Sequence, residues 1–164
     1  MAAVISIVQN WGSYAGGNEV AKTIFYFLPI QSGTASKNNN PMLIPASGTK
    51  YSYEIWLRFR CDYPPSIKCD NFKVWYDSGM PSSGYKITVN DPSISQYSEP
   101  TNTKSTKGNR VDFTTRDSSN KITVDGTLVN VGDYTEWLVF QLEVYSNAVA
   151  DDYSVIAYYQ YDEQ

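Results

Sequence analysis

Histidine is absent from the 164-residue sequence, and its absence excludes several kinds of site. Histidine supplies the base of the usual serine and cysteine triads, ligates zinc and titrates near neutral pH. Hydrolases of those classes are therefore not expected. A glycosidase needs only two carboxylates, for which the expected strands offer Glu54, Glu136 and Glu143. Because outward carboxylates on a strand are usually only solvated, we expect a protein that is not an enzyme.

Clustered basic residues and long apolar runs are also missing. The formal net charge is −4, and the lysines and arginines are scattered along the chain. Proteins that bind nucleic acid usually gather such residues into a basic patch. No apolar stretch approaches the length of a membrane span, and no basic residue precedes the short apolar run near the amino terminus. We therefore expect neither nucleic acid nor a membrane as a partner, and no secretory signal.

Cysteine is scarce, with only Cys61 and Cys69 on either side of DYPPSIK. Two strands leaving that loop could bring the cysteines close enough for a disulfide. The alternative is two reduced core thiols, because Cys61 shares a strand face with Leu57 and Phe59. Both interpretations remain open.

Metal ligands are few as well. Two cysteines lack the further ligands that zinc requires. The acidic residues of predicted turns match no known calcium-loop spacing, and they are Asp77, Asp117, Asp151 and Asp152. We expect no metal ion or other cofactor.

Valine, isoleucine and tyrosine are abundant, and serine, threonine, asparagine and glycine separate them, which is typical of β-strands joined by turns. The clearest strand lies at residues 51–61, where apolar residues from Tyr53 to Cys61 alternate with Glu54 to Arg60. This period of two predicts a half-buried antiparallel strand. Further strands are expected at 3–8, 23–30, 69–77, 85–89, 111–115, 137–145 and 153–161.

The number and spacing of these strands predict an all-β fold, a single-domain antiparallel β-sandwich of the immunoglobulin-like or jelly-roll type. Residues 31–50 and 90–121 are expected to form long loops or arms. The core should gather the apolar faces of the most regular strands, and its expected members are Leu57, Phe59, Leu138, Phe140, Leu142, Val155 and Ala157.

Aromatic side chains outside this core are candidates for partner binding, since flat amphipathic rings bury much area at little entropic cost. The candidates are Trp75, Tyr76, Tyr85 and Tyr97, with Trp56 as a further member of an aromatic platform. Tyr97 lies in the long polar loop, which we expect to act as an arm that contacts a neighbouring subunit. Deleting residues 93–107 should then leave a folded sandwich.

The last strand carries four tyrosines and ends on YDEQ. Alternate residues from Tyr153 to Tyr161 are expected to face the core, and Tyr158 should lie on the other face. The acidic pair Asp162-Glu163 is expected to discourage edge-to-edge pairing with a neighbour.

Four stretches, taken in order, resemble small β-sandwich structural proteins of the capsid-decoration type from tailed viruses of bacteria and archaea. They cover roughly residues 51–164, and they are YSYEIWLRF, NFKVWYDSGMPSSGYKITV, YSEPTNTKST and WLVFQLEVYSNAVADDYSVIAYYQYDEQ. The strongest part is the pair of closing strands followed by the terminal YDE. The chain departs from the usual pattern at Val149 to Asp152, where a Pro-Gly type of connection is expected.

The resemblance implies a virion structural or decoration protein that is made in the host cytoplasm. Such a protein binds capsid or other virion proteins through a sheet edge or polar loops, and could form a homo-oligomer. The competing interpretation is a carbohydrate-binding or adhesion module, which shares the fold and the exposed aromatic residues but is normally exported.

Overall fold

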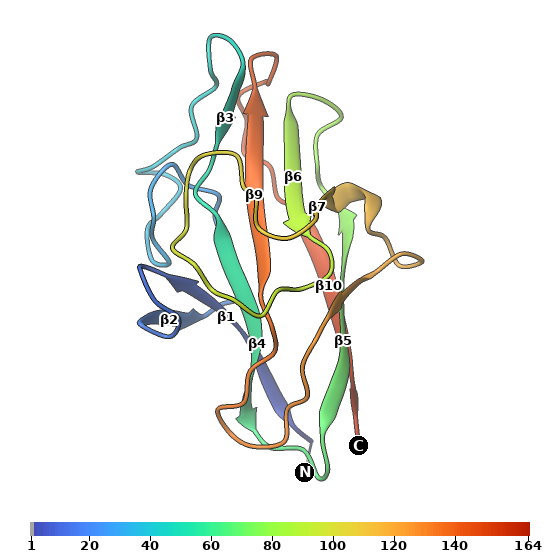
Figure 1. The fold of residues 1–164 in the computed structure, drawn as a ribbon. Coiled ribbons are helices and arrows are strands. Elements are labelled where there is room, and N and C mark those ends of the chain that lie inside the picture. The colour runs from blue at the N-terminus through green and yellow to red at the C-terminus, as the bar shows by residue number, and fades with distance from the viewer. Residues whose placement is uncertain (1) are drawn as a thin grey trace.

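Two antiparallel sheets pack face to face in the computed structural model, which describes residues 2–164 (Figure 1). The larger sheet has seven strands, in the order β2-β1-β4-β9-β6-β7 with β3 paired to the end of β9, and the smaller has the order β10-β5-β8. This arrangement confirms the predicted antiparallel β-sandwich. The bounds are β1 Val4–Trp11, β2 Asn18–Ala21, β3 Thr49–Tyr51, β4 Ile55–Tyr63, β5 Cys69–Ser78, β6 Tyr85–Asn90, β7 Arg110–Asp112, β8 Ile122–Val124, β9 Leu138–Tyr145 and β10 Ile156–Glu163.

Helix is nearly absent from the described chain. The 3-10 turn η1 (Phe113–Thr115) follows β7, because the Asp112 carboxylate accepts a hydrogen bond from the Thr114 backbone N–H at 3.0 Å. The strand expected at 111–115 is therefore only partly present, because β7 ends at Asp112 and η1 takes its place from Phe113. Within residues 2–164, no helix is long and apolar enough to cross a membrane.

The strand expected at 23–30 is wrong. A shorter strand, β2, ends at Ala21, and residues 22–48 run as irregular chain. The apolar residues of this segment are still used for packing, since Phe25 and Phe27 contact the core and Leu28 is buried. Two backbone hydrogen bonds tie this segment to the large sheet, from the Lys22 N–H to the Ile7 carbonyl at 3.0 Å and from the Tyr53 N–H to the Leu28 carbonyl at 2.9 Å. Apolar composition predicted the burial of this segment but not its pairing.

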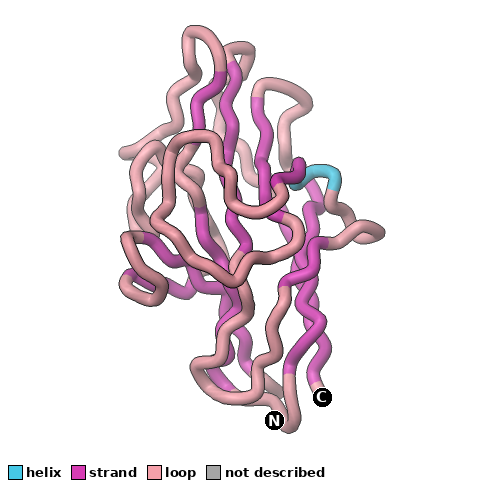
Figure 2. Tube along the Cα trace, viewed as in Figure 1, coloured by secondary structure: helices cyan, strands magenta, loops and turns pink. Residues whose placement is uncertain are grey.

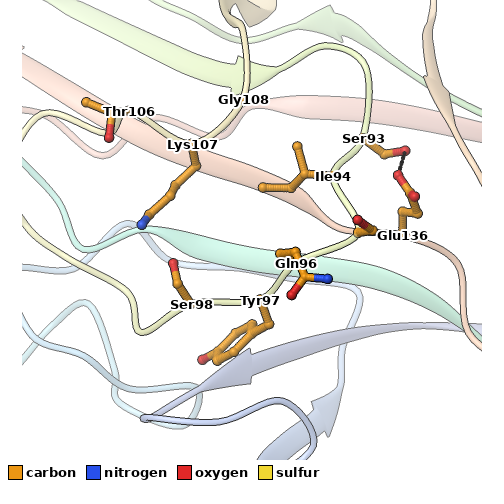
Figure 3. A pocket seen from close by; sticks show the side chains of 10 residues that line it. Ser93, Ile94, Gln96, Tyr97, Ser98, Thr106, Lys107, Gly108 and Glu136 are labelled. Atoms are coloured by element: carbon orange, nitrogen blue, oxygen red, sulfur yellow. Dashed lines mark hydrogen bonds between the residues drawn. The ribbon is translucent and has the colours of Figure 1, made fainter.

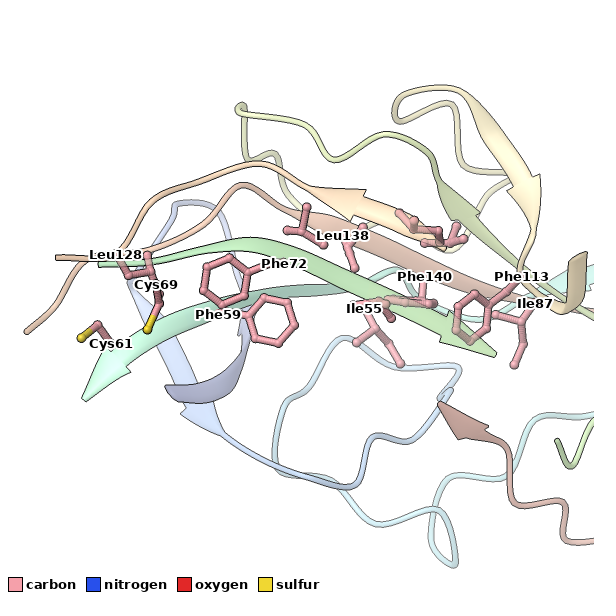
Figure 4. Close-up of a cluster of buried hydrophobic side chains, with 14 residues drawn as sticks. Ile55, Phe59, Cys61, Cys69, Phe72, Ile87, Phe113, Leu128, Leu138 and Phe140 are labelled. Atoms are coloured by element: carbon pink, nitrogen blue, oxygen red, sulfur yellow. The ribbon is translucent and has the colours of Figure 1, made fainter. Parts of the chain in front are cut away.

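The core lies between β4 and β9 of the large sheet and β5 and β8 of the small one (Figure 4). At its centre the rings of Phe59 and Phe72 stack with centroids 5.0 Å apart. Of the expected core residues, Phe59, Leu138 and Phe140 are buried, while Leu57, Leu142 and Val155 are partly buried at the margin. Ala157 is exposed, so its assignment to the core is wrong.

The prediction that β4 is half-buried is also wrong, because both of its faces are covered. Trp56, on the outer face of the large sheet, is 0% exposed and forms a second cluster with Trp137 and Val139. Residues 91–109, here called the cover segment, pack across this face and cross in front of β4 and β9 (Figures 1 and 2). The predicted projecting arm is therefore an internal cover.

Phe140→Ala is expected to lower the free energy of unfolding by about 3–5 kcal/mol, as large-to-small changes in a packed core do. Phe140 is 7% exposed, and its ring meets the Phe113 ring edge-on at 5.1 Å. Chemical denaturation measures the change. The control Leu43→Ala alters a side chain that is 61% exposed and should shift stability by less than about 0.5 kcal/mol. A wild-type midpoint for Phe140→Ala would contradict the core assignment.

Candidate functional site

A cleft of about 1180 Å³ opens between the two sheets alongside β10. One wall comes from residues 21–27 and the other from residues 151–159. The floor consists of core side chains, among them Leu57 and Phe59 of β4. The cleft exists because three strands do not cover the whole inner face of a seven-stranded sheet. Its lining is mostly apolar.

β10 borders the cleft as an edge strand. It pairs with β5 on one side and with no described strand on the other, so half of its backbone N–H and C=O groups face outward without a ladder partner. Its residues Ile156, Tyr158 and Tyr159 are 44–50% exposed. An apolar, aromatic and unpaired edge of this kind is a template for pairing with another chain.

The side chains of β10 alternate as the sequence predicts. Tyr159 packs against Phe59 at 5.4 Å and Tyr161 against Phe72 at 5.5 Å, both on the core side. Tyr158 lies on the opposite face, with its ring 5.8 Å from that of Trp75. The period of two is confirmed, although the strand carrying it is an exposed edge.

Polar contacts close both ends of the cleft. At the end where the chain termini meet (Figure 1), the Glu163 carboxylate accepts a hydrogen bond from the Ala3 backbone N–H at 2.7 Å. At the other end, Lys37 forms an ion pair with Asp152 at 2.5 Å, joining the 31–48 loop to the segment before β10. Between these contacts, the cleft runs along the segment before β10 and the first half of the strand.

Lys22 stands in the wall opposite β10. Lys22 is half-buried, and burial lowers the pKa of its ammonium group. Within residues 2–164, no carboxylate forms an ion pair with it. A partly desolvated cation without a counter-charge favours a ligand or partner that brings a hydrogen-bond acceptor.

The opposite, outer face of the large sheet is sealed by the cover segment. The Tyr97 ring packs at 4.8 Å from Trp56 and 5.2 Å from Trp137, and its hydroxyl donates to the Gly12 carbonyl at 2.7 Å. Burial raises the pKa of Tyr97 to about 12. Its ring and hydroxyl are already used inside the molecule, which argues against the predicted role of Tyr97 as a partner anchor.

A buried polar network fastens the cover to the sheet. The Gln141 amide donates to the Ser52 and Thr103 carbonyls at 2.9 and 2.8 Å and accepts from the Ser105 N–H at 2.8 Å. Nearby, Arg110 donates to the carbonyls of Val139 and Thr88. Burial lowers the pKa of Arg110 to about 10, although Glu54 and Glu143 oppose this shift.

The three glutamates considered for catalysis hold structural hydrogen bonds. Glu54 was expected to be solvated but is 3% exposed, and its carboxylate accepts from the Trp56 indole N–H at 3.2 Å. Glu143 is also buried and accepts from the Tyr145 hydroxyl at 2.7 Å. Glu136 accepts from the Ser93 hydroxyl at 3.0 Å (Figure 3). These structural hydrogen bonds account for the three carboxylates, so no catalytic role is needed to explain them.

A second hollow, a shallow pocket of about 620 Å³, lies on the surface of the cover segment, and Figure 3 shows the side chains that line it. Residues 93–98 and 106–108 line it together with Glu136. Four of the ten lining residues are serine or threonine, and Glu136 is already paired with Ser93. This pocket offers no group set apart for chemistry.

The remaining aromatic candidates are dispersed and form no common platform. Trp75 lies on the outer face of the small sheet beside Tyr158 and Lys121. Tyr76 packs at the core margin, where its hydroxyl accepts from the Met80 N–H at 3.1 Å. Tyr85 lines the cleft and donates to the Val149 carbonyl at 2.7 Å. Of the four predicted partner-binding residues, Tyr85 therefore reaches the cleft.

The two cysteines are free thiols, each 0% exposed at one end of the core (Figure 4). Burial raises the pKa of both thiols. Residues 2–164 contain no group of three or more histidine, cysteine, aspartate or glutamate side chains that could bind a metal ion.

Comparison of the chain with protein-family models, with curated proteins and with solved structures returned no match.

Sequence reasoning missed the cleft and its lysine. The apolar run at 23–30 was noticed but assigned to a strand, whereas it forms a wall that leaves Ile24 63% exposed. The signal that could have located the site is the last strand, where apolar or aromatic residues occupy both faces from Val155 to Tyr159. A strand apolar on both faces at a sheet edge indicates a missing neighbour.

Cys61 and Cys69 are expected to react very slowly with a thiol reagent such as Ellman's reagent in the native protein, because both are buried and protonated at neutral pH. In denaturant, both should react at once. Rapid native labelling would contradict the burial, and the absence of labelling in denaturant would reveal a disulfide instead.

Deletion of Ser93 to Lys107 is expected to destabilise the fold strongly, contrary to the expectation from the sequence. The deletion uncovers Trp56 and Trp137 and leaves the Gln141 amide without two of its partners. Thermal unfolding followed by circular dichroism measures the effect. Tyr97→Phe, which removes a single hydrogen bond, should cost only about 1 kcal/mol. A deletion variant as stable as wild type would show that the segment does not cover the sheet.

Proposed function

We propose that this chain is a non-enzymatic structural protein of a virion, a capsid decoration or surface protein that binds other virion subunits. The observation that carries the proposal is the apolar cleft along the free edge of β10. A sandwich whose interior is open along an edge strand gains stability when another protein covers the opening. Such a surface is better explained by binding to another protein than by catalysis.

The hydrogen bonds of the glutamates support a non-catalytic role. Glu54, Glu136 and Glu143 all accept hydrogen bonds that fix the sheet or its cover. Support for a virion in particular comes from the resemblance of residues 51–164 to small β-sandwich structural proteins of tailed viruses. On this proposal the chain is made in the host cytoplasm and is then incorporated into particles.

A carbohydrate-binding module is the second candidate, and one surface favours it. Trp75 and Tyr158 lie side by side on the outer face of the small sheet, and the Lys121 ammonium group lies 4.3 Å from the Trp75 ring centroid. Tyr158 is 50% exposed. Adjacent aromatic rings with polar neighbours can stack on a sugar ring.

The test is to band particles on a density gradient from cells whose virus encodes this chain, and to wash them at high salt. The chain is expected to remain with the particles, because a contact that buries apolar surface resists salt. Its absence from particles would contradict the virion role.

Trp75→Ala separates the two candidate functions. It removes one ring of the aromatic pair, and Trp75 does not line the cleft. Particle incorporation should therefore persist in this variant. Binding of the wild-type chain to a glycan array, lost in Trp75→Ala and independent of any particle, would instead establish the carbohydrate module.

A further inference from the structure

We propose that the cleft receives a single extended segment of another virion protein, which adds to the free edge of β10 as a fourth strand of the small sheet and places a carboxylate beside Lys22. Because the same cleft carries the proposed function, this inference rests on it and names the kind of contact. The segment is a chain terminus or a long loop of the partner, with side chains that alternate between apolar and polar.

Backbone groups on the free edge of β10 locate the contact. Ala157 lies opposite Tyr76 of β5, but the Tyr76 N–H donates to the Arg116 carbonyl at 2.7 Å and not to β10. Since successive residues of a strand point their backbone groups to opposite sides, Tyr158 bonds to β5, and the N–H and C=O groups of Ala157 and Tyr159 point to the free edge. Both of these residues line the cleft. An added strand would bond to them.

The side chains below this edge set the pattern of the added strand. Tyr159 packs against Phe59 of β4, and β4 pairs with β1 on the side away from β9. A strand beside β10 would therefore lie over the inward residues of β1, Ile5 and Ile7, and near Phe25. These three side chains line the cleft and are only partly buried. The inward row of the segment must be mainly apolar, while its outward row meets solvent.

The space beside β10 admits one strand and not a second folded sandwich. Beyond β4 the large sheet continues to β1 and β2, and residues 21–27 form the facing wall. A partner with its own second sheet would bring that sheet into the space of β1 and this wall. A terminus or a long loop brings a strand without a second layer. Residues 151–159 form the other wall, so a segment of about nine residues fills the cleft.

Lys22 stands at the level where the edge is free. Its N–H donates to the Ile7 carbonyl at 3.0 Å, which continues the pairing of β2 with β1 by one residue. Residues opposite each other in such a pair share a face, so the Lys22 side chain lies on the inward face with that of Ile7. Ile7 in turn lies opposite Phe59, which contacts Tyr159. A group that reaches Lys22 therefore comes from the inward row of the added strand.

Charge complementarity selects a carboxylate for that position. Of the other cations that line the cleft, Lys37 is paired with Asp152 and Arg58 with Glu19. Within residues 2–164, no ion pair is formed by Lys22. A purely apolar segment would cover this half-buried ammonium group without replacing its water, which is costly. An aspartate or glutamate among the apolar residues of the inward row pairs with it.

A synthetic peptide of nine residues, VTVTETVTV, tests the proposal by isothermal titration calorimetry. Its valines form one row with a glutamate at the centre, and a matched peptide carries glutamine there. We expect the glutamate peptide to bind the wild-type chain. Lys22→Met should weaken binding about tenfold, as loss of a charged hydrogen bond does, and Lys22→Arg should restore it. The glutamine peptide should lose the same factor on the wild type and nothing further on Lys22→Met.

Ala157→Pro tests the backbone contact. Proline removes an N–H that points to the free edge and is not bonded to β5, so the variant is expected to fold but to lose peptide binding. The control Ala157→Ser keeps the N–H and should bind as wild type does. Hydrogen exchange of the wild-type chain makes the test independent of this variant. The peptide should slow exchange of the Ala157 and Tyr159 amides and leave that of Tyr158 unchanged.

Three results would overturn the proposal: no binding of the peptide, binding that survives Ala157→Pro, or equal binding by Lys22→Met and the wild type. Binding of oleate in place of the peptide, dependent on Lys22 and unaffected by Ala157→Pro, would assign the cleft to a fatty acid and would also overturn it. Ala157→Pro at wild-type occupancy on particles would refute the strand contact and leave the virion role standing. A chain that binds the peptide but never enters particles would do the reverse.

Discussion

The inner face of a seven-stranded sheet must be covered by a sheet of only three strands, and the rest of the structure depends on this mismatch. The small sheet is centred on β5, where Phe72 stacks on Phe59 of the large sheet. On the side of β8, the turn η1 and the buried Phe113 complete the interior. On the side of β10 no described element does so, and core side chains such as Leu57 and Phe59 line an open cleft.

The outer face of the large sheet, in contrast, is covered by a long segment of the chain. The cover segment lays Tyr97 over Trp56 and Trp137, and buried side-chain hydrogen bonds fasten the segment to the sheet. Gln141 alone bonds to Ser52, Thr103 and Ser105. Buried networks of this kind specify one arrangement when they are fully paired. The central strands therefore bury both faces, while β10 buries only part of one.

This contrast explains why the cleft is the better candidate for binding. A loop that uses its aromatic ring and its amide groups internally has little left for a partner. An edge strand with exposed tyrosines, an unpaired lysine opposite and an interior behind it is incomplete as it stands. A partner protein would therefore gain most binding energy by covering β10 at the edge of the small sheet.

The sequence predicted what is local and periodic. Alternation identified the strands from β4 to β6, β9 and the inward row of the last strand, and it placed Phe59, Leu138 and Phe140 in the core. Period-two patterns cannot tell whether the second face of a strand meets solvent or a distant loop, so the burial of Trp56 and Glu54 was missed.

The candidate site could not be predicted for a related reason. Neither Lys22 nor the apolar run that follows it carries a motif, and their role depends on how many strands the opposite sheet contains. Short strands such as β3 and β8, each of three residues, leave almost no periodic signal. Sheet width is a property of the whole chain, and a local pattern does not encode it.

Hydrogen exchange of the β10 amides tests the central claim most directly. If one edge of β10 is free, its outward amides should exchange rapidly, whereas the amides that pair with β5 should be protected. Amides that the fold pairs elsewhere, such as that of Ser105 in the cover segment, should also be protected. Uniformly slow exchange along β10 would contradict the account.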